Sequence, residues 1–107
     1  MTVVASVSAH LAATRSIPAA DAVLEASPDY LQVWFTQDPD PVVSRLTLEG
    51  SDGAVEIGEA VVADGKSLWA PVSSRLMPGS YMLQWRTAGD DGHVRRGSIA
   101  FQVSAAD

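Results

Sequence analysis

Two histidines are the residues of this chain with the most specific chemistry. His10 lies near the start, and His93 follows Asp91 and Gly92 near the end; the 107 residues contain no other histidine and no cysteine. Imidazole nitrogens with a carboxylate oxygen in a tetragonal array suit Cu(II), which also heads the affinity order of the divalent metals. Two histidines and an aspartate need not meet in a fold, so the segments around them must decide whether they form a site.

Composition narrows the classes of protein. A chain of 107 residues is one domain that can bury a core of its own. The net charge of −6 and the lack of a basic segment argue against a nucleic-acid partner. The absence of cysteine excludes disulfides, thiolate metal sites and a cysteine nucleophile. No apolar run approaches the ~20 residues of a membrane span, so we expect no membrane insertion.

The first nine residues are small and apolar. Val7-Ser8-Ala9 resembles the small-residue motif at which signal peptidase cleaves. We interpret residues 1–9 as a leader remnant or flexible N-terminus and residues 10–104 as the domain. Cleavage after Ala9 would make His10 the first residue of the mature protein.

The rest of the chain shows the two-residue alternation of half-buried strands. The alternation is clearest at residues 30–35, 81–86 and 99–104, with turn residues rich in Asp, Gly and Pro between the runs. Further strands are expected at residues 11–16, 43–48, 55–62 with a break at Gly58, and 68–72. Only Ala19–Ala26 could make a helical turn. About seven strands at this spacing predict an all-β, Greek-key antiparallel β-sandwich of the immunoglobulin-like type.

One local motif and the aromatic residues fit this sandwich. Leu76-Met-Pro-Gly-Ser-Tyr81 has the form of a tyrosine corner, in which the phenol hydrogen-bonds backbone a few residues upstream. Trp34, Trp69 and Trp85 fall at strand spacing, so we interpret them as core or half-buried residues and not as a stacking platform. These residues are structural in our interpretation.

A series of motifs, in order and spacing, resembles the CopC-type periplasmic copper-binding proteins of bacterial copper resistance. The motifs are His10, Ser16-Ile-Pro-Ala19, Leu31-Gln-Val-Trp-Phe35, Leu76-Met-Pro-Gly-Ser-Tyr81, Trp85-Arg86, Asp91-Gly-His93, Gly97 and Phe101-Gln-Val103. The resemblance covers residues 9–103. It implies an exported Greek-key sandwich that binds Cu(II) through an N-terminal histidine, by its imidazole and free α-amine, and through an Asp-x-His motif. These ligands correspond to His10, Asp91 and His93.

The chain also departs from the family pattern. Gln37 stands where family members often carry an acidic residue; its amide could hydrogen-bond near the metal as an outer-shell group, but the lost charge should weaken binding. Asp91-Gly92 is also typical of a plain hairpin turn. Besides Met1 there are only Met77 and Met82, in a turn and at an outward strand position. We therefore expect no thioether site for Cu(I).

The resulting prediction is an extracytoplasmic, periplasmic Cu(II) carrier or buffer of copper homeostasis or resistance. We expect a monomer and no enzyme, and the resemblance implies an inner-membrane copper-transport partner. One alternative is a copper oxygenase with a histidine brace, against which stand the short chain and Asp91, because the aspartate would occupy a position that oxygen chemistry needs open. The other alternative is a metal-free adaptor sandwich that keeps the fold, with the ligands reduced to surface residues.

Overall fold

The computed structural model describes residues 10–105, and every regular element in this range is a β-strand. The strands are β1 (Ala13–Ile17), β2 (Ala22–Leu24), β3 (Tyr30–Phe35), β4 (Arg45–Gly50), β5 (Gly53–Val55), β6 (Val61–Ala63), β7 (Ser67–Pro71), β8 (Gly79–Ala88) and β9 (Val94–Val103). Residues 1–9, to which the leader interpretation applies, and residues 106–107 lie outside the described part. Within that part, no helix is long and apolar enough to cross a membrane.

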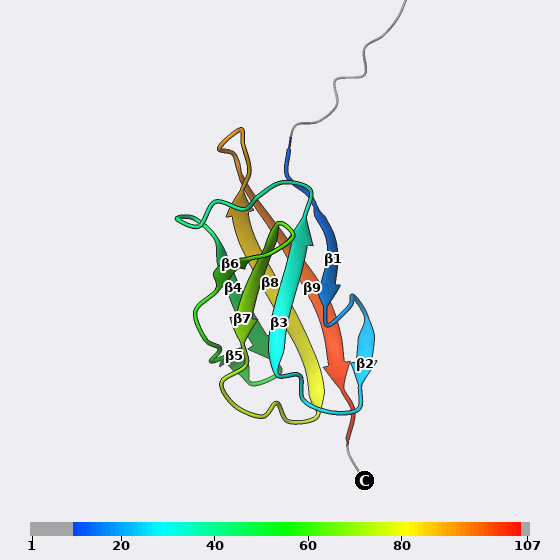
Figure 1. Cartoon of the computed structure of the whole chain (residues 1–107). Coiled ribbons are helices and arrows are strands. Elements are labelled where there is room, and N and C mark those ends of the chain that lie inside the picture. The colour runs from blue at the N-terminus through cyan, green and yellow to red at the C-terminus, as the bar shows by residue number, and fades with distance from the viewer. Residues whose placement is uncertain (1–9, 106–107) are drawn as a thin grey trace, which may run out of the picture.

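The strands form two sheets that face each other (Figure 1). One sheet has four strands in the order β1-β3-β7-β6, and the other has five in the order β2-β9-β8-β4-β5. Four of the seven neighbouring pairs join strands that are not consecutive in the chain, as expected of a Greek-key sandwich. The predicted all-β fold class is confirmed, with nine strands described in place of about seven.

The alternating residues build the core between the sheets. From β3, Leu31, Val33 and Phe35 are buried, while the residues between them are half-buried. From the facing sheet, the buried members include Leu83, Trp85, Ile99, Phe101 and Val103. Each such side chain contributes about 1.5–3 kcal/mol by leaving water, so the core fixes which face of each strand points outward.

One predicted element is wrong and another is only partly as predicted. Residues 19–26 contain no helix: Ala22–Leu24 forms β2, which pairs in parallel with β9. Eight residues are too few for a stable isolated helix, and the edge of β9 offers partners for the backbone. The predicted strand at 55–62 is two strands, β5 and β6, in different sheets. The predicted break is confirmed, because residues 56–60 belong to neither strand. Gly58 packs closely against Pro71, since a Cβ there would lie 2.4 Å from Cγ of Pro71.

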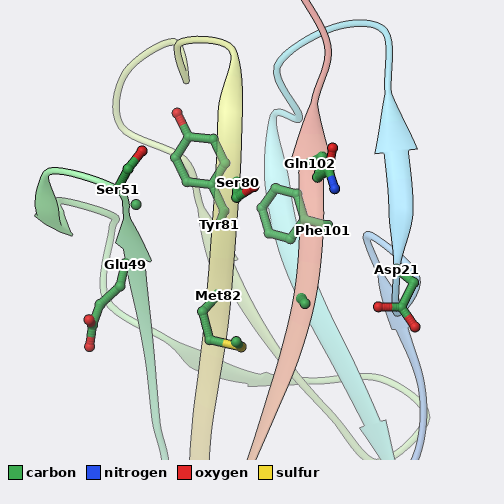
Figure 2. A pocket seen from close by; sticks show the side chains of 10 residues that line it. Asp21, Glu49, Ser51, Ser80, Tyr81, Met82, Phe101 and Gln102 are labelled. Carbon is green, nitrogen blue, oxygen red and sulfur yellow. The ribbon is translucent and has the colours of Figure 1, made fainter.

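The tyrosine corner is confirmed at the start of β8. The Tyr81 hydroxyl donates a hydrogen bond to the backbone carbonyl of Met77. The Tyr81 ring also stacks on Phe101 of β9, with ring centroids 5.5 Å apart (Figure 2). This corner lies at the opposite end of β8 from the loop that joins β8 to β9. That loop and the start of β1 share the other end of the sandwich (Figure 1).

Candidate metal centre

The loop at residues 89–93, between β8 and β9, carries Asp91 and His93. The Gly92 N–H donates to the Gly89 carbonyl at 3.0 Å and closes the turn. Gly92 has a φ of 75°, which glycine adopts without the steric cost of a Cβ. The His93 N–H then donates to Oδ1 of Asp91 at 2.9 Å. The turn therefore holds the aspartate and the histidine on one side of the loop.

His10 reaches this loop from the start of the domain. The next residue, Leu11, is 1% exposed and belongs to the core. The Ala12 N–H donates to Oγ1 of Thr36 at 3.0 Å, and the Thr36 N–H donates to the Ala12 carbonyl at 2.9 Å. These contacts fix the backbone after His10 to the end of β3, beside the loop.

The structure brings His10, Asp91 and His93 together. Nδ1 of His10 lies 2.6 Å from Oδ2 of Asp91, and Nδ1 of His93 lies 3.6 Å from the same oxygen. The imidazole rings stack with centroids 5.5 Å apart and planes inclined by 30°. One ligand atom from each residue can be chosen so that all three lie within 4.8 Å of one another. Residues 81 positions apart in sequence thus form one cluster.

The cluster is accessible to solvent and contains an ionised carboxylate. The side chains of His10 and His93 are 41% and 71% exposed. The pKa of Asp91 lies below its ordinary value of 3.8, first because the His93 N–H donates to it and further because of the His10 side chain. A carboxylate that stays ionised attracts a cation and is ready to coordinate it.

Gln37 supports the backbone of the same loop. Its Oε1 accepts a hydrogen bond from the Asp90 N–H at 2.8 Å. Gly89 makes this approach feasible, because a Cβ there would lie 2.2 Å from that oxygen. This role of Gly89 was not predicted, because its only signal in the sequence is a glycine that precedes Asp90-Asp91-Gly92. The outer-shell role of Gln37 stays a prediction.

The donor set consists of two imidazoles and a carboxylate, which fits a borderline or hard divalent cation. The described methionines are remote from it. Met77 is 71% exposed in the loop before β8, and Met82 lies on the outer face of β8 (Figure 2). Neither of these two sulfur-containing side chains therefore joins the cluster.

Comparison with known proteins identifies relatives that share the fold and most of the length of this chain. The family model described as the CopC domain matches residues 13–104. Protein YobA of Escherichia coli K12 is 30% identical over 103 residues, which cover 92% of this chain and 82% of that protein.

Two solved structures share the fold over nearly the whole chain. CopC from Methylosinus trichosporium OB3b superimposes with a TM-score of 0.81 at 25% identity, covering 92% of this chain and 97% of that one. PcoC, a methionine-rich copper resistance protein from Escherichia coli, gives a TM-score of 0.76 at 28% identity, covering 90% and 100%. These relatives support a copper-related function and none points to catalysis. The chain belongs to the CopC family of copper-binding proteins.

Proposed function

We propose that the chain binds one Cu(II) ion through His10, Asp91 and His93. The observation that carries the proposal is the convergence of their ligand atoms within 4.8 Å. Metal bonds to nitrogen and oxygen of about 2.0–2.2 Å place two ligands of one ion about 3–4 Å apart. Small rotations of the two exposed imidazoles are sufficient to bring the ligand atoms from this separation to the one that an ion requires, since neither ring is held in the core.

The ligand chemistry supports Cu(II) over Cu(I) in this proposal. Imidazole and carboxylate favour Cu(II), whereas Cu(I) prefers thioether and thiolate sulfur. The PcoC relative is described as methionine-rich, but this chain has only Met1, Met77 and Met82. We therefore assign the cluster to Cu(II) and no site to Cu(I).

The α-amine of His10 is a further ligand in our proposal when the protein begins at that residue. An amine and an imidazole on one residue form a chelate, which costs less ordering entropy than two separate ligands. Residues 1–9 would have to be removed first, which is consistent with export from the cytoplasm.

The role that fits such a site is a periplasmic carrier or buffer of copper. An exposed ion held by side chains at one end of a rigid sandwich can be exchanged without opening the core. A monomer that passes copper to or from an inner-membrane transport partner would use this end. A histidine-brace oxygenase is not favoured, because Oδ2 of Asp91 lies close to both imidazoles and, as a ligand, would take a position that oxygen chemistry needs open.

Spectroscopic titration of purified protein beginning at His10 tests the proposal. His10→Ala and His93→Ala should weaken Cu(II) binding by more than about a hundredfold, since even outer-shell changes cost 10–100-fold. Asp91→Asn should weaken it by about tenfold, because a carbonyl oxygen without the negative charge replaces the carboxylate. Asp90→Asn is the matched control, which removes the same charge one residue away and should change the affinity by less than about threefold.

Two outcomes would refute this site. Unchanged affinity in His93→Ala would place the copper elsewhere. Absence of Cu(II) binding by folded parent protein would favour the metal-free adaptor.

A further inference from the structure

Three arginines stand side by side on the outer face of the five-stranded sheet. Arg45 of β4 pairs with Arg86 of β8, and Arg86 pairs with Arg96 of β9. Their neighbours Leu46 and Trp85 point into the core, so the arginines point outward. We call these three residues the arginine row. It holds half of the six arginines of a chain whose net charge is −6.

The arginine row has no countercharge of its own. Within residues 10–105, none of its guanidinium groups forms an ion pair or a hydrogen bond with a carboxylate. Nε of Arg86 is buried and has no hydrogen-bond partner. It is the only buried side-chain nitrogen or oxygen within residues 10–105 that lacks one. Like charges directly opposite each other destabilise a sheet, and a buried charged donor without an acceptor costs more. An anion on the row would remove both costs.

The row lines a groove of about 340 Å³. The other lining residues are Thr47, Gln84 and Trp85. Thr47 and Gln84 are cross-strand partners on the same outer face, and the Thr47 hydroxyl donates to Oε1 of Gln84 at 3.4 Å. The amide nitrogen of Gln84 thus remains as a donor next to the guanidinium groups. Every charged residue that lines this groove is positive.

A second groove on the same face has the opposite character. It lies toward the other end of β8 and β9, and its charged lining residues are Asp21 and Glu49 (Figure 2). Glu49 is four residues from Arg45 along β4, about 13 Å at the rise of a strand. That distance exceeds the screening length of about 8–10 Å, so Glu49 does not neutralise the arginine row.

We infer that the groove at the arginine row binds a small polyvalent oxyanion, with two or more phosphate or carboxylate groups. Strands 4.7–4.9 Å apart give the row a length of about 10 Å, and guanidinium forks match such oxygens. The sheet is three strands wide here, because β5 pairs only with residues 48–50 and β2 only with residues 101–103. A compact ligand fits this width, whereas a longer acidic peptide would extend past both edges.

Calorimetric titration of metal-free protein with pyrophosphate and, separately, citrate tests the inference. The two anions distinguish phosphate from carboxylate ligands. We expect one of them to bind with a Kd below about 1 mM and to bind more weakly as salt rises. Arg86→Gln should weaken binding by about tenfold or more, and Arg45→Gln and Arg96→Gln, at exposed positions, should each weaken it severalfold.

Arg75→Gln is the matched control, because it removes one positive charge from a loop outside the groove and should change the affinity by less than about twofold. Lack of binding of both anions at about 10 mM, or equal loss in Arg75→Gln and Arg86→Gln, would overturn the inference. Tighter binding of hexaglutamate than of either small anion would instead identify a surface for an acidic protein. Cu(II) affinity, measured in parallel, should be unchanged in Arg86→Gln, so this result and the copper proposal succeed or fail separately.

Discussion

Asp91 uses its two carboxylate oxygens for different tasks. Oδ1 accepts the His93 N–H and so fixes the turn, while Oδ2 faces the imidazoles of His10 and His93. The residue that organises the loop is therefore the one that supplies the charge of the candidate centre. An asparagine at this position keeps an acceptor for the His93 N–H but loses the charge.

The lowered pKa of Asp91 predicts a pH dependence of folding stability in the metal-free protein. A carboxyl group whose pKa is lower in the folded state stabilises the fold at pH values above its ordinary pKa of 3.8. This contribution is lost as the pH falls through the lower pKa of the folded state. The stability advantage of the parent over Asp91→Asn should thus shrink on acidification below about pH 5. Urea denaturation between pH 7 and pH 2 measures it; a constant difference over that range would contradict the lowered pKa.

Gly89 is expected to control the loop through Gln37. In Gly89→Ala the new Cβ would meet Oε1 of Gln37 at 2.2 Å, so the amide must move and lose its bond to the Asp90 N–H. We expect Cu(II) affinity to fall by up to about tenfold, because the loop carries two ligands. The double variant Gly89→Ala with Gln37→Ala tests the coupling, and part of the loss should be recovered. Strictly additive effects in the titrations would show that the contact does not matter.

At the scale of the elements, the sequence predicts well where one face of a strand is buried. Leu31, Val33 and Phe35 lie inward in β3 as predicted, as do Ile99 and Phe101 in β9. A strand with one buried face must alternate, so its pattern is local and readable. The bounds of β3 are as predicted, those of β1, β4, β7 and β8 shift by one or two residues, and β9 begins five residues earlier than predicted. Backbone pairing, and not hydrophobicity, sets the ends of a strand.

The features that the residue pattern did not predict depend on contacts between residues that are distant in sequence. The three residues of β2 are all apolar, so its sequence shows no alternation of apolar and polar residues. The edge of β9 holds this strand, and the Asp21 N–H donates to the Ala100 carbonyl at 2.7 Å. The candidate centre is similar, because no periodicity indicates that His10 meets Asp91. Family resemblance supplied that pairing and singled out Gln37. The structure adds the supports from Leu11 and Gly89, which the pattern of residue types did not reveal, and the contact of Gln37 with the backbone of the loop.

The tyrosine corner at the start of β8 should contribute measurably to the stability of the fold. Tyr81→Phe removes the hydrogen bond to the Met77 carbonyl while keeping the ring on Phe101. The free energy of unfolding should fall by about 1 kcal/mol. Tyr30→Phe is the matched control, because the Tyr30 ring stacks on Trp69 and its hydroxyl has no hydrogen-bond partner among the described residues. Chemical denaturation should show a shift only in Tyr81→Phe, and equal midpoints for both variants would contradict the role of the corner.

At the scale of the whole molecule, the two ends of the sandwich carry different tasks. The tyrosine corner lies at one end, remote from the candidate centre, while β1 and the β8–β9 loop meet at the other (Figure 1). His10 is the first residue that the structure describes at this second end, and it is itself a candidate ligand. The state of the chain before His10 should therefore matter for copper more than for folding.

Protein that begins at His10 should bind Cu(II) more tightly than protein that retains residues 1–9. With these residues attached, the nitrogen of His10 is a peptide amide without a basic lone pair, so the amine–imidazole chelate is lost. Imidazoles and Asp91 remain, and binding should continue at an affinity lower by about tenfold or more. The form that begins at His10 should also gain affinity as the pH rises toward the α-amine range of about 7.7–8.0, since metal and proton compete for that nitrogen.

Copper titration of both forms at several pH values, with electron paramagnetic resonance to detect nitrogen ligands, measures the difference. Both forms should unfold at the same denaturant concentration in the absence of metal, because Leu11 and the residues after it hold the fold. A chain with an alanine added before His10 is the sharpest control, because it converts the amine to an amide and adds almost nothing else. Equal affinities and identical Cu(II) spectra in the three proteins would exclude the α-amine as a ligand and leave the ion to the side chains of His10, Asp91 and His93 alone.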